Sequence, residues 1–96
     1  MATLIKVDGT KTEVFPKNKR KGFTLAEVYN LMSCRLVELV GPLDDGRSML
    51  VDEEGKLKAE WMSRINSEAT HLFRTRYGAH DVIVGDALLV TDKEFQ

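Results

Sequence analysis

Arginine, amide and aromatic side chains gather in one segment of the sequence, residues 61–77. Guanidinium groups bind phosphates and carboxylates through paired hydrogen bonds, and the same residue types are enriched at protein–protein interfaces. The segment therefore predicts a ligand pocket or an interaction surface. The alternative is a helix whose arginines face solvent while the tryptophan packs on a sheet. The candidate ligand-binding residues are Trp61, Arg64, Asn66, Arg74, Arg76 and Tyr77.

Three adjacent carboxylates, Asp52, Glu53 and Glu54, precede Gly55. They could form a metal or acid–base site, but a calcium loop spreads its oxygen ligands over about a dozen residues and ends in a bidentate glutamate. An aspartate at the start of a tight turn and a glycine at its end are favoured turn chemistry. We therefore expect the tip of a hairpin, with residues 49–51 and 56–58 as its two arms.

A basic cluster, Lys17, Lys19, Arg20 and Lys21, follows Pro16. Runs of like charge usually form solvated loops, although these side chains could also contact phosphate or an acidic partner. The formal net charge of −1 argues against a protein that coats nucleic acid, because such proteins are normally basic. Nucleic acid is therefore the less favoured partner.

The sequence contains no recognisable catalytic or cofactor-binding signature. It has no phosphate-binding glycine loop, no HExxH and no paired CxxC. His71 and His80 lack the spacing of a helical metal pair, and we expect one to be half-buried and the other to lie in a loop. The single cysteine, Cys34, excludes a disulfide within the chain and is expected to be a small buried residue. We therefore expect no enzyme, no metal and no cofactor.

The sequence predicts neither a signal peptide nor a membrane span, because it has no apolar run of the required length. The lone cysteine fits a reducing compartment, so we expect a cytoplasmic protein. Its 96 residues suit one domain, residues 1–96. A domain this small has little room for an internal cavity, which makes a surface groove or a subunit interface the easier site to build.

Periodicity and turn residues predict where these candidates lie. Strands are expected over 2–7 and 11–15, joined at Asp8-Gly9, and a strand over 36–40. A helix over 25–34 begins at a Thr24–Glu27 capping box and buries Leu25, Val28, Leu31 and Met32. A second helix begins at Asn66 or Ser67 and ends at Gly78. Residues 81–90 read as a strand pair or as one strand bulged at Gly85.

The resulting order is β-β-α-β-β-α-β, an α+β fold with a small, mostly antiparallel sheet of about five strands. We expect both helices on one face of that sheet.

The strings "MLVDEEGKLK", "INSEATHLF" and "DVIVGDALLV" resemble a family of short, uncharacterised proteins carried by bacteriophages, plasmids and other mobile elements. None of these strings is catalytic. The resemblance implies a mobile-element origin and a location in the host cytoplasm, and it transfers no active site.

Three functions fit these observations. The leading hypothesis is a non-enzymatic binding protein that occupies a host protein or sequesters a small molecule. Its sharper version is a counter-defence protein that sequesters a nucleotide signal at a homo-oligomer interface. The second is a nucleic-acid-binding accessory protein. The third is a small enzyme using Asp52, Glu53, Glu54 or His71. Beside these three, a small structural or interaction module is a further alternative.

Overall fold

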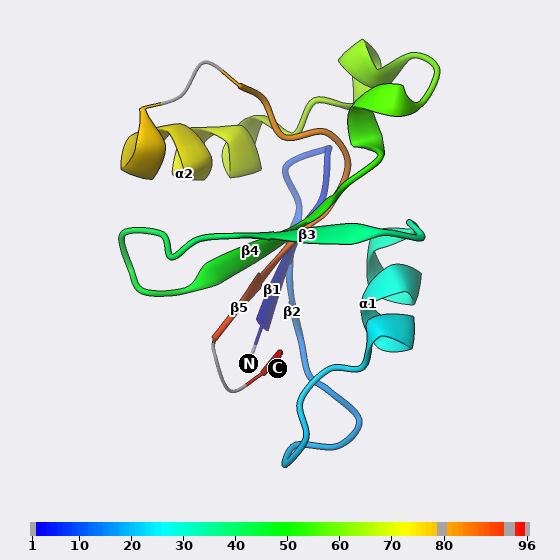
Figure 1. Ribbon diagram of the computed structural model, residues 1–96, viewed down its shortest axis with the longest axis vertical. Coiled ribbons are helices and arrows are strands. Elements are labelled where there is room, and N and C mark those ends of the chain that lie inside the picture. The colour runs from blue at the N-terminus through cyan, green and yellow to red at the C-terminus, as the bar shows by residue number, and fades with distance from the viewer. Residues whose placement is uncertain (1, 79–80, 92–93, 96) are drawn as a thin grey trace.

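Five antiparallel strands form one sheet in the computed structural model, which describes residues 2–78, 81–91 and 94–95 (Figure 1). The order across the sheet is β2-β1-β5-β4-β3. The strands are β1 (Ala2–Ile5), β2 (Lys11–Val14), β3 (Val37–Val40), β4 (Ser48–Asp52) and β5 (Ala87–Val90). The helices are α1 (Leu25–Met32) and α2 (Ser67–Tyr77), with two short 3-10 helices, η1 (Gly55–Leu57) and η2 (Trp61–Arg64). The predicted α+β class and the order β-β-α-β-β-α-β are confirmed.

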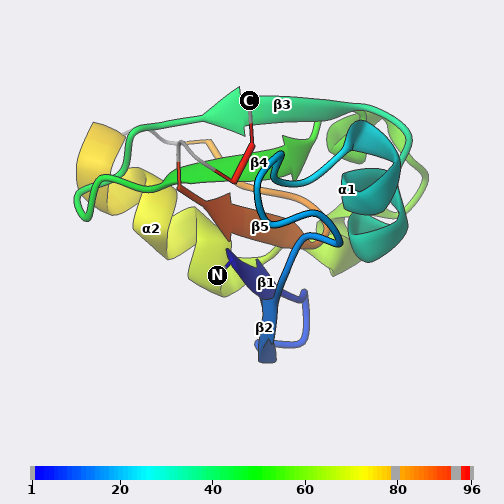
Figure 2. The same cartoon turned by 90° about the horizontal axis from the view of Figure 1, so that it is seen from below.

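The two helices cover opposite faces of the sheet, so the prediction of one shared face is wrong (Figures 1 and 2). Neighbouring residues of the central strands alternate between two cores, as Leu88 packs on the α1 side and Leu89 on the α2 side. β5 is buried at all four positions because neither of its faces meets water. The unbroken apolar run in "ALLV" is the sequence signal of such a strand.

The N-terminal hairpin and α1 follow their predicted local chemistry. Gly9 has a φ of 92°, and the Asp8 carboxylate accepts a hydrogen bond from the Thr10 N–H, which closes the turn between β1 and β2. The Thr24–Glu27 capping box is present. α1 ends two residues earlier than predicted because Ser33 takes a left-handed conformation. Leu25, predicted to be buried, is half exposed.

α2 begins and ends where the sequence indicated. The Asn66 side chain accepts a hydrogen bond from the Ala69 N–H and so caps the first turn. Gly78 ends the helix in a left-handed conformation that glycine adopts without steric cost. Residues 82–84 form no strand: Val84 makes an isolated bridge to Ile65, and the chain bends at Gly85 before β5. No described helix is long and apolar enough to cross a membrane.

Candidate functional site

Residues 55–64, hereafter the lobe, project from the sheet between β4 and α2 (Figure 1). Both ends of the lobe meet the same residue. Gly55 packs so tightly on Val84 that a Cβ at position 55 would lie 3.0 Å from the Val84 carbonyl oxygen, and Ile65 bridges Val84 from the other end. The lobe is therefore a closed loop of the kind that is often functional.

The turn predicted at Asp52–Gly55 exists, but its interpretation as a hairpin tip is wrong. Residues 53–54 form a turn that leads into η1, and residues 56–58 pair with no strand. The partners of β4 are β3 and β5. Gly55 is buried, with no positive φ, so its function in the fold is the close contact with Val84 rather than turn conformation.

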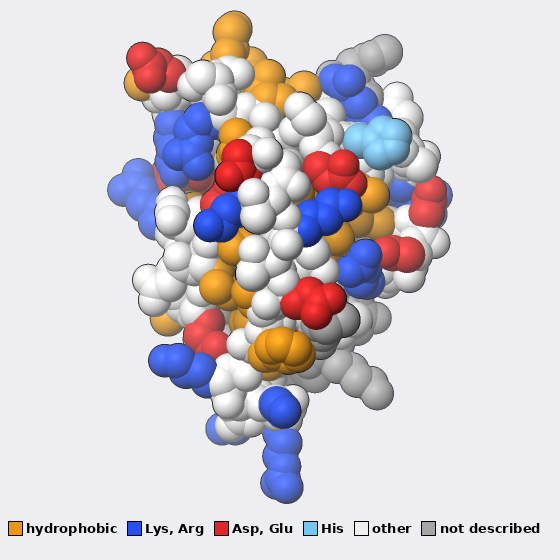
Figure 3. All heavy atoms as spheres, turned by 180° about the vertical axis from the view of Figure 1, so that it is seen from behind, with side chains coloured by type: hydrophobic (Ala, Val, Ile, Leu, Met, Phe, Trp, Pro, Cys, Tyr) orange, Lys and Arg blue, Asp and Glu red, His pale blue; other side chains and the backbone are white. Residues whose placement is uncertain are grey.

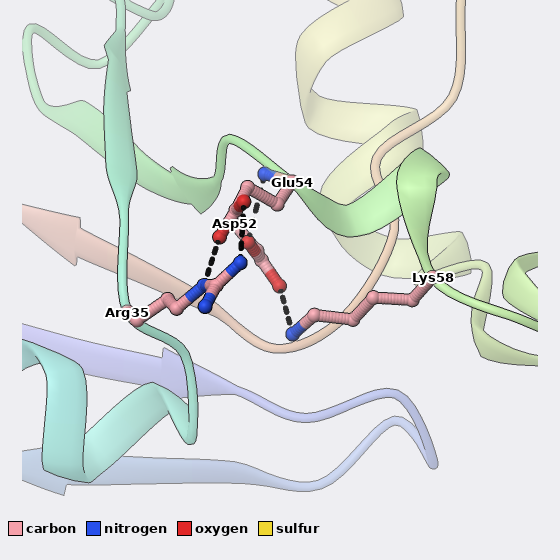
Figure 4. A network of polar contacts seen from close by, with 4 residues as sticks. All are labelled: Arg35, Asp52, Glu54 and Lys58. Carbon is pink, nitrogen blue, oxygen red and sulfur yellow. Dashed lines mark hydrogen bonds and ion pairs between the residues drawn. The ribbon is translucent and has the colours of Figure 1, made fainter.

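Two ion pairs fix the base of the lobe (Figure 4). The Asp52 carboxylate, whose side chain is only 7% exposed, accepts hydrogen bonds from Lys58 Nζ at 2.7 Å and from the Glu54 N–H at 2.9 Å. The Glu54 carboxylate binds Arg35 in a two-point contact, at 2.7 Å from Nε and 3.1 Å from Nη2. The Arg35–Glu54 pair ties the base of the lobe to the segment that joins α1 to β3, and the Asp52–Lys58 pair ties the lobe to the end of β4. The carboxylates predicted as a turn thus also anchor the loop that follows.

The hydrogen bonds from Arg35 lower the pKa of the Glu54 carboxyl below its usual value. A group with a lowered folded-state pKa stabilises the fold above its unfolded pKa, and that contribution is lost as the pH falls through the folded pKa. We therefore expect the lobe to loosen as the pH falls below the usual pKa of a glutamate carboxyl and through the lowered pKa of Glu54. Trp61, the only tryptophan, lies in the lobe, so its fluorescence should report the change.

A Glu54→Gln variant is the control for this titration, because it cannot lose a proton at position 54. Its fluorescence should be flatter over the same pH range than that of the wild type. Equal titration curves for the two proteins would mean that the Arg35–Glu54 pair does not hold the lobe.

The lobe exposes large apolar side chains. Leu57 is 82% exposed and Met62 is 71% exposed, and half-buried Trp61 lies beside Met62. In the view of Figure 3, hydrophobic side chains gather at the upper end of the molecule, where the lobe lies. Leu57 and Met62 are not among the site residues predicted from the sequence. The sequence does contain a signal for each of them. Leu57 stands alone between two lysines, and Met62 follows the tryptophan directly.

The predicted arginine and aromatic set does not converge on one point of the chain. Arg74 Nε donates to the Asp81 carbonyl oxygen, whereas Arg76 lies 3.9 Å from Asp44. The Tyr77 hydroxyl donates to the Pro42 carbonyl oxygen at 2.9 Å, in the loop between β3 and β4. Arg64 belongs to the lobe and is exposed. The set is therefore divided between the lobe and two separate sides of α2.

Asn66 is fully buried, and its side chain holds the fold together. Its amide nitrogen donates to the Ile5 carbonyl oxygen at 2.9 Å and to the Gly85 carbonyl oxygen at 3.0 Å. Its amide oxygen caps α2 at Ala69. Asn66 thus joins β1, the bend before β5 and the start of α2, and every one of its polar atoms is used.

The basic cluster forms a tight, solvent-exposed turn at one end of the molecule. The Asn18 side chain accepts hydrogen bonds from the backbone N–H groups of Arg20 and Lys21. The Lys17 N–H donates to the Glu27 carboxylate at the start of α1. Among the described residues, none forms an ion pair with the side chains of Lys19, Arg20 or Lys21, so their charge is presented to solvent.

The remaining reactive side chains give little support to chemistry. Burial raises the pKa of the Cys34 thiol, which favours the protonated, weakly nucleophilic form. His71 is exposed on α2 and lines a hollow of about 300 Å³ with Ser67 and Arg74. His80 lies outside the described residues. Within the described part of the chain, no three carboxylate, histidine or cysteine side chains stand close enough together to hold a metal ion.

These features define the protein as a small α+β domain with a helix on each face of one antiparallel sheet and, at one end of it, a lobe that exposes two large apolar side chains. The chain belongs to the family described as a domain of unknown function, DUF3846, whose model matches residues 2–96. No curated protein and no solved structure is significantly similar to the chain.

Proposed function

We propose that the protein is a non-enzymatic binding protein that docks on a protein partner through the lobe. One observation carries the proposal: Leu57 and Met62 are largely exposed within a single ten-residue loop. One exposed leucine is ordinary on a protein surface. The lobe also carries Trp61 and an exposed arginine, Arg64, and methionine, tryptophan and arginine are residue types enriched at protein interfaces.

The anchoring of the lobe supports the same proposal. Its base is held by the Asp52–Lys58 and Arg35–Glu54 pairs and by the contacts of Gly55 and Ile65 with Val84. A loop that is already held in one conformation loses less entropy when it binds. The lobe therefore presents its apolar side chains at a lower cost than a loose loop of the same sequence.

The setting of this function rests on the resemblance to mobile-element proteins. We place the protein in the host cytoplasm, where it occupies a host protein as a counter-defence. We favour a protein partner over a nucleotide signal because Arg74 lies on a different side of α2 from Arg76 and Tyr77, whose guanidinium and ring stack on each other. A nucleotide pocket built from those residues would need a second chain to complete it.

A photo-cross-linking amino acid at position 62 tests the proposal in host cells. We expect it to trap one partner, and an excess of unlabelled wild-type protein should abolish the adduct. A Leu57→Asp/Met62→Asp competitor should leave the adduct intact, because charged groups in an apolar contact carry a large desolvation cost. Adducts that both competitors remove equally would exclude the lobe as the docking site.

The unpaired charge of the basic cluster favours a second candidate function, contact with a nucleic-acid backbone. Binding to DNA or RNA would then weaken steeply with salt, by about 0.9 in log K per unit of log salt for each phosphate contact. Replacing Lys19, Arg20 and Lys21 with glutamate should remove this binding, while Lys6→Ala should leave it nearly unchanged. Absence of any gel shift at low salt would rule out this function.

A further inference from the structure

β3 is an open edge of the sheet. It is the last strand in the order β2-β1-β5-β4-β3, and no described segment lies outside it (Figure 2). The Glu53 N–H donates to the Leu36 carbonyl oxygen at 3.1 Å. Along an antiparallel pair, every second residue of a strand forms its backbone hydrogen bonds with the neighbouring strand. The backbone N–H and C=O groups of Leu36, Glu38 and Val40 therefore point toward β4. The backbone N–H and C=O groups of Val37 and Leu39 therefore point outward.

The opposite edge of the sheet, β2, is protected in a way that β3 is not. The Lys6 N–H donates to the Thr10 carbonyl oxygen, so by the same alternation the outward positions of β2 are Lys11 and Glu13. Both are exposed and charged, which discourages pairing with another strand. The outward positions of β3 are Val37 and Leu39, and the Leu39 side chain is 56% exposed.

We propose that β3 pairs antiparallel with β3 of a second copy of this chain, about a twofold axis at Leu39. An edge strand is complementary to itself in this arrangement, because each outward backbone donor meets an acceptor of the partner. An axis at Glu38 would place two carboxylates opposite each other, which is destabilising. An axis at Val37 would require an extended Arg35, but the chain bends at that residue.

Charge and apolar contacts both fit the axis at Leu39. Leu39 lies opposite Leu39 of the partner subunit, so each exposed leucine covers the other. Beyond the strand, the loop that carries Asp44 and Asp45 lies beside the partner's Arg35. The Arg35 side chain is 83% exposed and that of Asp44 is 62% exposed, so opposite charges meet on both sides of the axis.

The first test compares two proline variants by sedimentation over a concentration series. Leu39→Pro removes an outward N–H, leaves the bonds between β3 and β4 in place and should convert a dimer into a monomer. Glu13→Pro makes the same change at the β2 edge and should remain a dimer. If proline disturbs folding, Leu39→Glu is the alternative variant. It should also give a monomer, because it places two carboxylates opposite each other at the axis.

A wild-type chain that stays monomeric throughout the series, or a dimer that survives both Leu39 variants, would overturn the proposal. A cysteine test locates the axis independently in a Cys34→Ala background. Opposite residues of an antiparallel pair lie within the Cα separation of a disulfide, so Leu39→Cys should give a covalent dimer on mild oxidation. Glu13→Cys should not, and equal cross-linking of the two variants would also contradict the pairing.

This dimer goes beyond the proposed docking function and does not depend on it. The Leu39 variants should keep the affinity of the lobe for its partner in a one-to-one titration. The lobe variants should keep the dimer. The two proposals can therefore fail separately.

Discussion

An Asn66→Ala variant should lose about 4 kcal/mol of the free energy of unfolding. The substitution leaves the buried carbonyl oxygens of Ile5 and Gly85 without their donor, at about 1–3 kcal/mol each, and removes the α2 cap, at about 1 kcal/mol. A small domain has only about 5–15 kcal/mol to lose. Thermal unfolding followed by circular dichroism should show a Tm lower by roughly 20 °C.

Two matched variants separate the contributions of Asn66. Ser67→Ala changes the next, exposed residue and should shift stability by less than about 0.5 kcal/mol. Asn66→Asp keeps an oxygen that can cap Ala69 but has no donor for the two carbonyl groups. It should therefore remain strongly destabilised. If Asn66→Ala unfolded within about 1 kcal/mol of the wild type, the buried amide would not be the junction that its hydrogen bonds indicate.

A Leu57→Asp/Met62→Asp variant should bind the cross-linked partner at least about 100-fold more weakly than the wild type. Hot-spot side chains each contribute about 2 kcal/mol or more, and about 1.4 kcal/mol corresponds to a tenfold change in affinity. Stability should hardly change, because both side chains are mostly in water in the free protein. The expected result is thus a folded protein with a specific loss of binding.

Phe15→Asp is the matched control for this variant. Phe15 is also an exposed apolar residue, at 60%, but it lies next to β2 and outside the lobe. Its replacement should leave the affinity for the partner unchanged. Equal losses in the two variants would indicate non-specific hydrophobic binding rather than docking through the lobe.

Local chemistry made most of the secondary structure predictable. The Thr24–Glu27 box, the Asn66 cap and the glycines at 9 and 78 act within a few residues, so the sequence alone indicated where the elements begin and end. The placement of the helices on opposite faces depends on contacts between distant residues. The apolar run "ALLV" indicates that both faces of β5 are covered, because a strand without alternating polar residues has no face toward solvent.

The candidate site was less predictable because exposure cannot be read from residue type. Leu57 in "KLK" has the pattern of a strand residue, yet it is 82% exposed in a loop that begins where Gly55 packs on the distant Val84. Asn66 looked like a ligand-binding amide, yet its partners Ile5 and Gly85 are far away in sequence. Arg74 and Arg76 are neighbours in sequence but point to different sides of one helix.

Titration calorimetry of the purified partner with this protein tests the docking function most directly. The wild type and Phe15→Asp should bind saturably, with one lobe per partner and equal affinity. Leu57→Asp/Met62→Asp should show at least about a 100-fold weaker Kd. If the double variant bound as tightly as the wild type, the lobe would not be the binding surface, and the function proposed for this protein would be wrong.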